Sequence, residues 1–150
     1  MDTLERLEAV EEIKQLFHRR IRYMDTHQWH LYAGLHTADA ATETYGADNR
    51  ITGAEAIAGA IQAFMEGPPA ISSVHQAFNP EIEFTGDDSA TGIWPMEDRL
   101  WWQNGEQEEW LHGWGHYHEQ YRKVEGRWLI SFRKLERLRV DMSPGFAGRG

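Results

Sequence analysis

The segment ATGIWPMEDRLWW, residues 90–102, decides how the rest of this chain can fold. Side chains of a β-strand alternate between two faces, so one face of a strand here is apolar except for a single carboxylate, that of Asp98. The residues on that face are Ala90, Gly92, Trp94, Met96, Asp98, Leu100 and Trp102. An isolated charge is costly to bury, so Asp98 must be paired, protonated or chemically active. It is the first candidate for a functional residue.

The opposite face of the same segment mixes charged residues with Ile93 and Trp101. Such a mixture is typical of a surface or of a contact between subunits. The segment therefore predicts a strand with one face toward the core and one face outward.

The periodicity of the chain changes at Gly67-Pro68-Pro69. Before this point, apolar spacings of three and four predict helices over residues 3–24, 29–36 and about 52–66, with a strand over 38–45. Asp2 and Glu5 form a capping box for the first helix. After it, alternation predicts strands over 71–78, 81–85, 90–103, 109–124 and 127–140, joined by short turns. Helices followed by antiparallel strands predict an α+β fold with the helices on one face of a curved sheet.

Length and composition limit the classes of protein that this chain can form. At 150 residues it is one domain, expected over 1–140, with 141–150 as a patternless and mobile tail. A net charge of −9 argues against nucleic acid and anionic membranes as partners. The absence of cysteine excludes disulfides and thiolate metal sites. The acidic start and the lack of a long apolar run predict a cytoplasmic protein that binds small molecules or a second copy of itself.

Seven short motifs follow one another along the chain. They are Asp25-x-x-x-Trp29, Leu35-His-Thr-Ala-Asp39-Ala, Gly53-Ala-Glu-Ala-Ile57, Val74-His75-Gln76, Trp94-x-Met96-Glu97-Asp98, Gly115-x-Tyr117-x-Glu119-x-Tyr121 and Gly126-x-Trp128-x-Ile130. Over residues 4–140 this order resembles the SnoaL-like branch of the nuclear-transport-factor-2-like superfamily. That branch includes polyketide cyclases, scytalone dehydratase, bile-acid dehydratase and ketosteroid isomerase relatives.

The resemblance implies a cone-shaped antiparallel sheet wrapped around three helices, with an internal pocket. It also implies acid and base side chains that work without a metal or an organic cofactor, and a homodimer. Within the pocket it places Tyr117, Glu119 and Tyr121. Trp29, Trp94 and Met96 are expected as core or pocket wall, because ligand sites combine apolar walls with a few polar groups.

His75, Asp98 and Tyr23 are the predicted catalytic residues. The resemblance places His75 where dehydratases carry a pocket histidine that takes a proton from carbon, and an imidazole suits a general base near neutral pH. Asp98 is expected to accept the His75 N–H or to act as an acid, with an ion pair to Arg20, Arg133 or Arg137 as the alternative. Where these dehydratases carry a tyrosine this chain has Arg20, and Tyr23, three residues on, is the proposed replacement.

Two other sites admit two interpretations. Asp25 ends the first helix and is either a pocket residue or, as we favour, the N-cap of the second helix. His116 and His118 share the outward face of their strand, where a metal site is the alternative to a contact between subunits.

The sequence therefore predicts a cofactor-independent dehydratase, isomerase or cyclase acting on a hydrophobic carbonyl compound. The alternative is a non-catalytic module of the same fold that binds a small hydrophobe or another subunit.

Overall fold

The computed structural model of the protein describes residues 1–44 and 46–146. Three helices, α1 (Thr3–Asp25), α2 (Trp29–Ala33) and α3 (Ala54–Glu66), accompany one large sheet. The strands are β1 (His36–Thr42), β2 (Ile51–Thr52), β3 (Ser72–Ala77), β4 (Glu81–Gly86), β5 (Ser89–Asn104), β6 (Gln107–Val124) and β7 (Arg127–Met142), with a short 3₁₀ turn, η1 (Ala47–Asn49). The predicted α+β class is confirmed.

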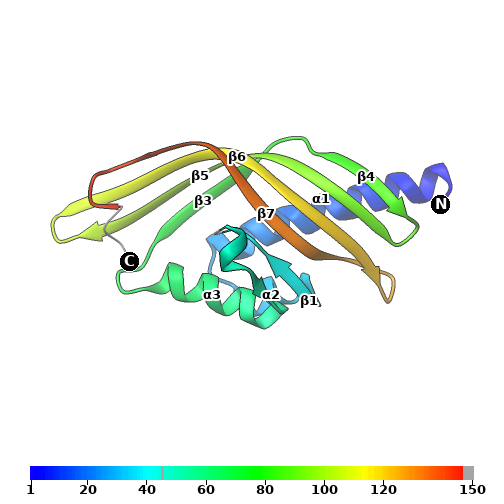
Figure 1. Cartoon of the computed structure of the whole chain (residues 1–150), viewed down its shortest axis with the longest axis horizontal. Helices are drawn as coiled ribbons and strands as arrows, with labels where there is room; N and C mark the ends of the chain where they lie inside the picture. The colour runs from blue at the N-terminus through cyan, green and yellow to red at the C-terminus, as the bar shows by residue number, and fades with distance from the viewer. Residues whose placement is uncertain (45, 147–150) are drawn as a thin grey trace.

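The long helix α1 begins with the predicted capping box, in which Asp2 and Glu5 each accept from the other's backbone N–H. Its buried face carries Ile13, Phe17, Arg20 and Met24, at helical spacings. This face lies along the sheet, while α2 and α3 pack beside each other at one side (Figure 1). Arg20 is a charged residue among the buried side chains of this helix, which indicates that this face has a role besides packing in the core.

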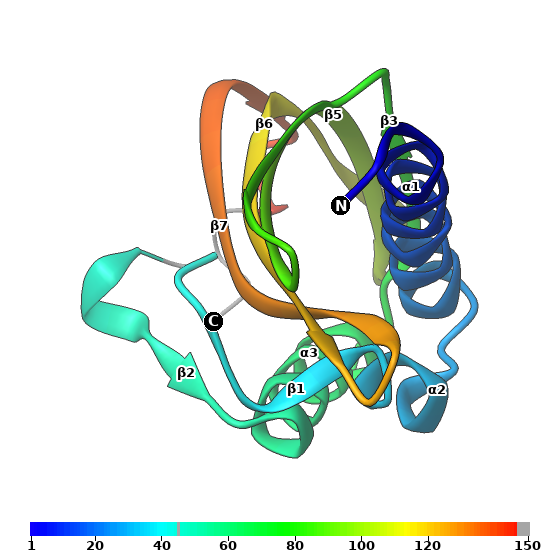
Figure 2. The ribbon, with the colours of Figure 1, turned by 90° about the vertical axis from the view of Figure 1, so that its right-hand side faces the viewer.

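The sheet has the strand order β2-β1-β7-β6-β5-β3, with β4 also paired to β5. Neighbouring strands from β3 to β7 are antiparallel, as predicted, but β1 runs parallel to β7. The sheet is therefore mixed, which corrects the expectation of a wholly antiparallel one. Figure 2 shows the sheet curling from β3, beside α1, round to β1 and β2. The result is an open cone with the helices against its concave side.

The alternation predicted for residues 90–102 is present in β5. Ala90, Trp94, Met96, Asp98 and Leu100 are buried, whereas their odd-numbered neighbours are partly or fully exposed. The Trp94 ring stacks on Phe17 of α1, with ring centroids 4.0 Å apart. This contact fixes the helix against the middle of the sheet and closes the core below the site described next.

Several boundaries differ from the sequence prediction; the strand predicted over 38–45, for example, is β1 (His36–Thr42). The second helix ends at Ala33 rather than near residue 36, because Gly34 closes it and His36 already pairs with Ile130 in the sheet. At the other end, β7 continues to Met142, and Ser143 and Phe146 are buried, so residues 141–146 are not the patternless tail expected. The predicted strand residue Tyr45 and the tail residues 147–150 lie outside the described residues. No helix in the described parts of the chain is long and apolar enough to cross a membrane.

Candidate active site

A cavity of about 300 Å³ lies between α1, α3 and the concave face of the sheet. Its apolar wall comes from Met24, Ile61, Phe64, Met65, Leu100, Leu111, Leu135 and Phe146. Its polar lining consists of Arg20, Thr44, His75, Asp98, Tyr117, Arg133 and Arg137. A largely apolar cavity with convergent polar groups is the usual form of a small-molecule site.

His75 and Asp25 form the tightest polar pair at this cavity. Nδ1 of His75 lies 2.6 Å from Oδ1 of Asp25, and the His75 backbone N–H donates to Oδ2 at 2.8 Å. The Ser73 hydroxyl also donates to Oδ1, at 2.7 Å. Because a carboxylate accepts hydrogen bonds, Nδ1 is the donating ring nitrogen, and in the neutral imidazole Nε2 carries the lone pair. The pair has the arrangement of an oriented general base.

This geometry corrects two expectations. The N-cap position of α2 is occupied by Gln28, without a side-chain cap, so Asp25 is not the cap. Asp25, not Asp98, accepts the ring N–H, since the nearer Asp98 oxygen is 3.7 Å from Nε2 on the other side of the imidazole. The reason is positional: Asp25 ends α1 directly opposite the edge strand β3 that carries His75.

Asp98 is held by Arg137 instead, which was among its alternative partners. The guanidinium donates to both carboxylate oxygens, Nη1 to Oδ1 at 2.9 Å and Nη2 to Oδ2 at 2.8 Å. Burial opposes ionisation of Asp98, but the hydrogen bonds and charge of Arg137 outweigh it and hold the pKa of Asp98 below its ordinary value. Asp98 is therefore a carboxylate in the cavity wall, which favours the role of an acceptor over that of a proton donor.

The guanidinium of Arg137, on β7, reaches Asp98, on β5, by passing over Gly113 of the intervening strand β6. Gly113 is the residue that pairs with Asp98 in the sheet. A Cβ atom at Gly113 would collide with Arg137 Nη1 and Asp98 Oδ1. The missing side chain at this position therefore makes room for the ion pair between β5 and β7.

A second charged cluster lies deeper, where Arg20 and Arg133 share Glu119. Oε2 of Glu119 is 3.6 Å from Nε of Arg20 and 3.7 Å from Nη1 of Arg133, and all three side chains are almost fully buried. Burial opposes the charge of Arg20, but the nearby Glu119 carboxylate outweighs it and raises the pKa of Arg20. Two guanidiniums and one carboxylate leave one net positive charge beneath the cavity.

The guanidinium of Arg20 is also short of hydrogen bonds. Its Nε and Nη2 have no hydrogen-bond partner among the described residues, and its carbon lies 4.6 Å from the centroid of the Tyr117 ring and 4.9 Å from that of Phe17. A buried donor without an acceptor is costly, so these groups favour an acceptor supplied by a ligand. Burial raises the pKa of Tyr117, which keeps its hydroxyl neutral and able to donate.

Side chains behind this cluster hold its members in place. Arg133 donates to Tyr32 Oη at 2.7 Å and contacts Nε2 of His36 at 3.2 Å. Burial and the charge of Arg133 lower the pKa of His36 to about 3, so this imidazole is neutral and accepts. On the other side, Tyr121 donates to Oε1 of Glu119 and accepts from Trp94, both at 2.8 Å. The charged floor of the cavity is thus built into the core.

The other predicted site residues take different places. Tyr117 lines the cavity, whereas Glu119 lies under Arg20 and Arg133. Trp29, Trp94 and Met96 are buried in the core and do not line the cavity. Tyr23 was wrongly expected in the pocket, since it lines a separate surface hollow with Arg19 and His30. Arg20, the departure from the dehydratase pattern, occupies the pocket position itself.

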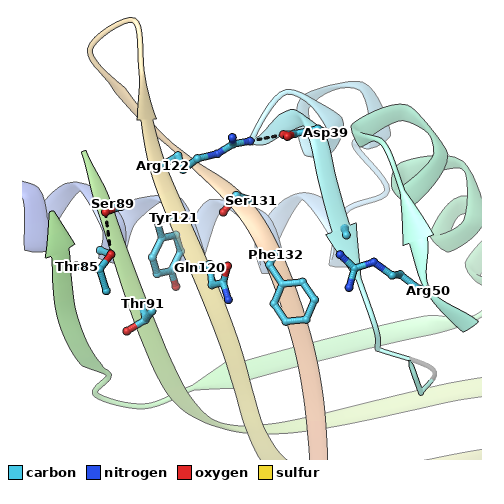
Figure 3. Close-up of a pocket in the computed structure, with 12 residues that line it drawn as sticks. Asp39, Arg50, Thr85, Ser89, Thr91, Gln120, Tyr121, Arg122, Ser131 and Phe132 are labelled. Atoms are coloured by element: carbon cyan, nitrogen blue, oxygen red, sulfur yellow. Dashed lines mark hydrogen bonds and ion pairs between the residues drawn. The ribbon is translucent and has the colours of Figure 1, made fainter. Parts of the chain in front are cut away.

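A larger hollow of about 750 Å³ opens on the outer face of the sheet (Figure 3). It is lined by hydroxyl and amide groups of β4 to β7 and by the Arg122–Asp39 ion pair. Its described lining includes no histidine, and Arg50, the remaining arginine there, pairs with Glu43. Because this lining offers no base comparable to His75, the internal cavity is the candidate active site.

His116 and His118 alternate with the buried residues of β6, as predicted. His118 contacts Glu136 on β7 at 3.3 Å. Within the described ranges no group of three or more histidine, cysteine, aspartate or glutamate side chains could hold a metal ion.

The chain belongs to the SnoaL-like family, whose domain profile matches residues 5–134. Solved structures share its fold. A scytalone dehydratase-like protein from Novosphingobium aromaticivorans DSM 12444 is 18% identical, with a TM-score of 0.79 over 93% of this chain and 91% of the other. Hexachlorocyclohexane dehydrochlorinase LinA-type3 from Novosphingobium barchaimii LL02 is 21% identical, with a TM-score of 0.80 over 96% of both chains. Aln2 from a Streptomyces species is 20% identical, with a TM-score of 0.72 over 87% of this chain and 91% of the other.

Proposed function

We propose that this protein is a cofactor-independent acid/base enzyme acting on a small hydrophobic carbonyl compound in the internal cavity. The observation that carries the proposal is the 2.6 Å contact between Nδ1 of His75 and Asp25 at the wall of an apolar cavity. This contact leaves Nε2 of His75 as the basic atom. The dehydratase-like and dehydrochlorinase names among the proteins of this fold agree with proton removal from carbon.

In the proposed reaction, Nε2 of His75 takes a proton from the carbon next to the carbonyl. Asp25 holds the Nδ1 proton and stabilises the imidazolium that forms. The substrate then carries a negative charge on its oxygen, and Arg20 with Tyr117 provides donors for that oxygen. The net positive charge of the cluster formed by Arg20, Arg133 and Glu119 matches this developing charge. The charges of the site therefore balance best after the proton has moved.

The test uses indan-1-one, a two-ring ketone that suits a cavity of this size. The protein is mixed with this ketone in D₂O, and NMR measures how fast the carbon-bound protons of the ketone exchange for deuterium. The wild-type protein is expected to speed exchange at C2, and His75→Ala is expected to lower the rate by about 10²- to 10⁴-fold. His116→Ala, on the outward face of β6, is the matched control and should catalyse exchange at C2 at the wild-type rate. Equal rates in His75→Ala and the wild type would refute the proposal.

A non-catalytic binding module is the second candidate, favoured by the large apolar share of the cavity wall. Under this alternative, indan-1-one would bind near Phe64 and Leu111 and shift their NMR signals without any exchange at C2. The same spectra therefore separate the two candidates.

We infer in addition that the protein forms a homodimer through the outer face of the sheet. Ile93 and Trp101 lie on this face, and Trp110, which pairs with Trp101, is 41% exposed. Apolar groups of this kind on an outer face favour contact with another surface. Trp101→Glu should shift the sedimentation coefficient to that of a monomer, and a wild-type monomer would refute the inference.

A further inference from the structure

Two arginines beneath the cavity share one carboxylate. Glu119 forms an ion pair with Arg20 at 3.6 Å and with Arg133 at 3.7 Å, and both guanidiniums are at most 2% exposed. Arg133 also contacts the hydroxyl of Tyr32 and the imidazole of His36, which is neutral because its pKa is lowered to about 3. The two arginines therefore carry one more positive charge than Glu119 balances, and an uncompensated buried charge is unfavourable.

The other charged groups of the cavity do not remove this excess. Asp98 is neutralised by Arg137, which donates to both of its oxygens. Asp25 binds His75 at the opposite wall, and the Asp25 side chain is 19% exposed, so water also reaches its charge. The unbalanced positive charge therefore stays at Arg20, which lines the cavity.

The unpaired donors of Arg20 have the geometry of a carboxylate receptor. Nε and Nη2 have no hydrogen-bond partner in the described part of the chain. These two nitrogens form one edge of the guanidinium, where parallel N–H groups match the two oxygens of a carboxylate. Glu119 does not supply this match, because its Oε1 is bound by Tyr121 and its Oε2 lies 3.6 Å from Nε, beyond hydrogen-bond distance.

A ketone alone cannot satisfy the donors at this end of the cavity. A carbonyl oxygen has two lone pairs, whereas Nε and Nη2 of Arg20 and the hydroxyl of Tyr117 together offer more than two donating hydrogens. An ionised carboxylate has about four lone-pair positions, so it can accept from both nitrogens of Arg20. It also brings the negative charge that the two arginines lack. The ligand that completes this site therefore has an acid group in addition to its carbonyl.

We propose that Arg20 is the receptor for a carboxylate of the ligand, so that the cavity takes a hydrophobic keto acid in its ionised form. This proposal rests on the proposed function, since it places the ketone of the same molecule beside His75. The apolar wall, which includes Phe64 and Leu111, receives the ring. Tyr117 remains as the donor for the ketone oxygen.

The test compares two ligands of nearly equal shape, 3-oxoindane-1-carboxylate and 3-oxoindane-1-carboxamide. The first is an anion at pH 7, because a carboxylic acid ionises near pH 4, and the second is neutral. Both keep the ketone and the C2 position of indan-1-one. Calorimetry on the wild-type protein is expected to show that the carboxylate binds about 10- to 100-fold more tightly, as for hydrogen bonds to charged groups. Equal affinities would overturn the proposal.

The variant that removes the receptor is Arg20→Met. It leaves Glu119 paired with Arg133, so no buried charge loses its partner, and the carboxylate and the carboxamide should then bind with equal affinity. Arg19→Met is the matched control, since it removes a positive charge from an exposed position of the same helix and should keep the wild-type preference.

A second variant, Arg20→Gln, is measured if Arg20→Met fails to fold. It keeps a polar side chain at this position without the charge, so the preference for the carboxylate should fall by about ten-fold or more. A preference at the wild-type level in a folded variant of Arg20, checked by circular dichroism, would contradict the proposal.

The outcomes separate this proposal from the one on which it rests. If the carboxylate is preferred through Arg20 but the wild-type protein exchanges no proton at C2 of either ketone, the acid/base function fails and recognition of an acid stands. If indan-1-one exchanges its C2 protons but the carboxylate is not preferred over the carboxamide, the base is supported and the keto acid is refuted as the ligand.

Discussion

Oδ1 of Asp25 and Nδ1 of His75 lie 2.6 Å apart, although 50 positions separate the two residues in the sequence. The contact joins the last residue of α1 to an inward position of the edge strand β3. Asp25 accepts from two donors of His75 and from the hydroxyl of Ser73, so its orientation is fixed from β3 at three points. The orientation of the proposed base therefore depends on how α1 docks against the sheet.

Replacing Asp25 by Asn should lower proton exchange on indan-1-one by about 10²- to 10⁴-fold while the fold is kept. The neutral amide of asparagine does not stabilise the charge of a His75 imidazolium as a carboxylate does. Its NH₂ group, itself a donor, would also face the donors of Ser73 and His75. The measurement is the C2 exchange rate, with circular dichroism to check the fold. Ser73→Ala is the control, because it removes only one of the three hydrogen bonds to Asp25 and should cost far less activity. A rate in Asp25→Asn equal to that of Ser73→Ala would speak against Asp25 as the partner of the base.

His36 should make the stability of the protein depend on pH. Its pKa is lowered from 6.5 to about 3 in the folded protein, so below pH 6.5 the unfolded chain takes up a proton that the folded protein does not. Stability is therefore lost as the pH falls from 6.5 toward 3, and the loss from this residue at pH 5 is about 2 kcal/mol.

Urea unfolding at pH 7 and pH 5 measures this effect. His36→Gln keeps an acceptor for Arg133 but has no proton to gain, so the difference in unfolding free energy between the two pH values should shrink by about that amount. His30→Gln, at an exposed position of α2, should leave the difference unchanged. If His36→Gln showed the same difference in unfolding free energy between pH 7 and pH 5 as the wild type, the acid sensitivity would have to come from other groups.

Gly113→Ala should destabilise the protein by about 1–3 kcal/mol, because a Cβ atom there displaces the fork between Arg137 and Asp98. Gly59 offers the opposite case: it lies at an exposed position in the middle of α3, and a Cβ there would meet nothing within 4 Å. Gly59→Ala should stabilise by about 0.5–1 kcal/mol through helix propensity. Thermal unfolding of both variants tests the prediction, and a melting temperature for Gly113→Ala at or above that of the wild type would contradict it.

Glu109 should control the C-terminal wall of the cavity. Its buried carboxylate accepts from the Ser143 hydroxyl and the Gly145 backbone N–H, while Phe146 packs on the cavity. Glu109→Leu removes the acceptor shared by these two donors, so amide hydrogen exchange at Ser143, Gly145 and Phe146 should rise by at least about ten-fold. Glu108→Leu, the exposed neighbour on β6, is the control and should leave exchange in this segment unchanged. Equal exchange in the two variants would show that Glu109 does not order this segment.

The fold could be predicted from the sequence because its signals are local. The strict alternation in residues 90–102 indicated the inward face of β5, and the Gly67-Pro68-Pro69 break marked the end of α3. The parallel pairing of β1 with β7 has no local signal, since it depends on which edge of the sheet the chain reaches after the helices. Residues 141–146 have no local pattern, and Ser143 and Gly145 among them bond to Glu109, more than thirty positions away, which a reading of neighbouring residues cannot show.

The residues of the site were harder to predict than the fold. His75 and Asp98 were noticed because a histidine and a buried carboxylate stand out on strands, but their partners lie on other elements. The sequence favoured a capping role for Asp25 and gave Arg137 as one of three possible ion-pair partners of Asp98, and only the folded structure shows the contacts of these two residues with His75 and Asp98. Arg20 carried a usable signal, since it lies on the apolar stripe of α1 together with Phe17 and Met24.

The cavity wall divides according to its origin in the chain. The charged residues come from α1 and from strands of the sheet, and their partners extend into the core as far as Trp94 and His36. α3 contributes only Ile61, Phe64 and Met65, which have apolar side chains and lie on one helix. None of the residues proposed for proton transfer therefore lies on α3. A library of variants confined to these three positions, with Phe146, is expected to change which molecules the cavity accepts while the residues proposed for proton transfer stay unchanged.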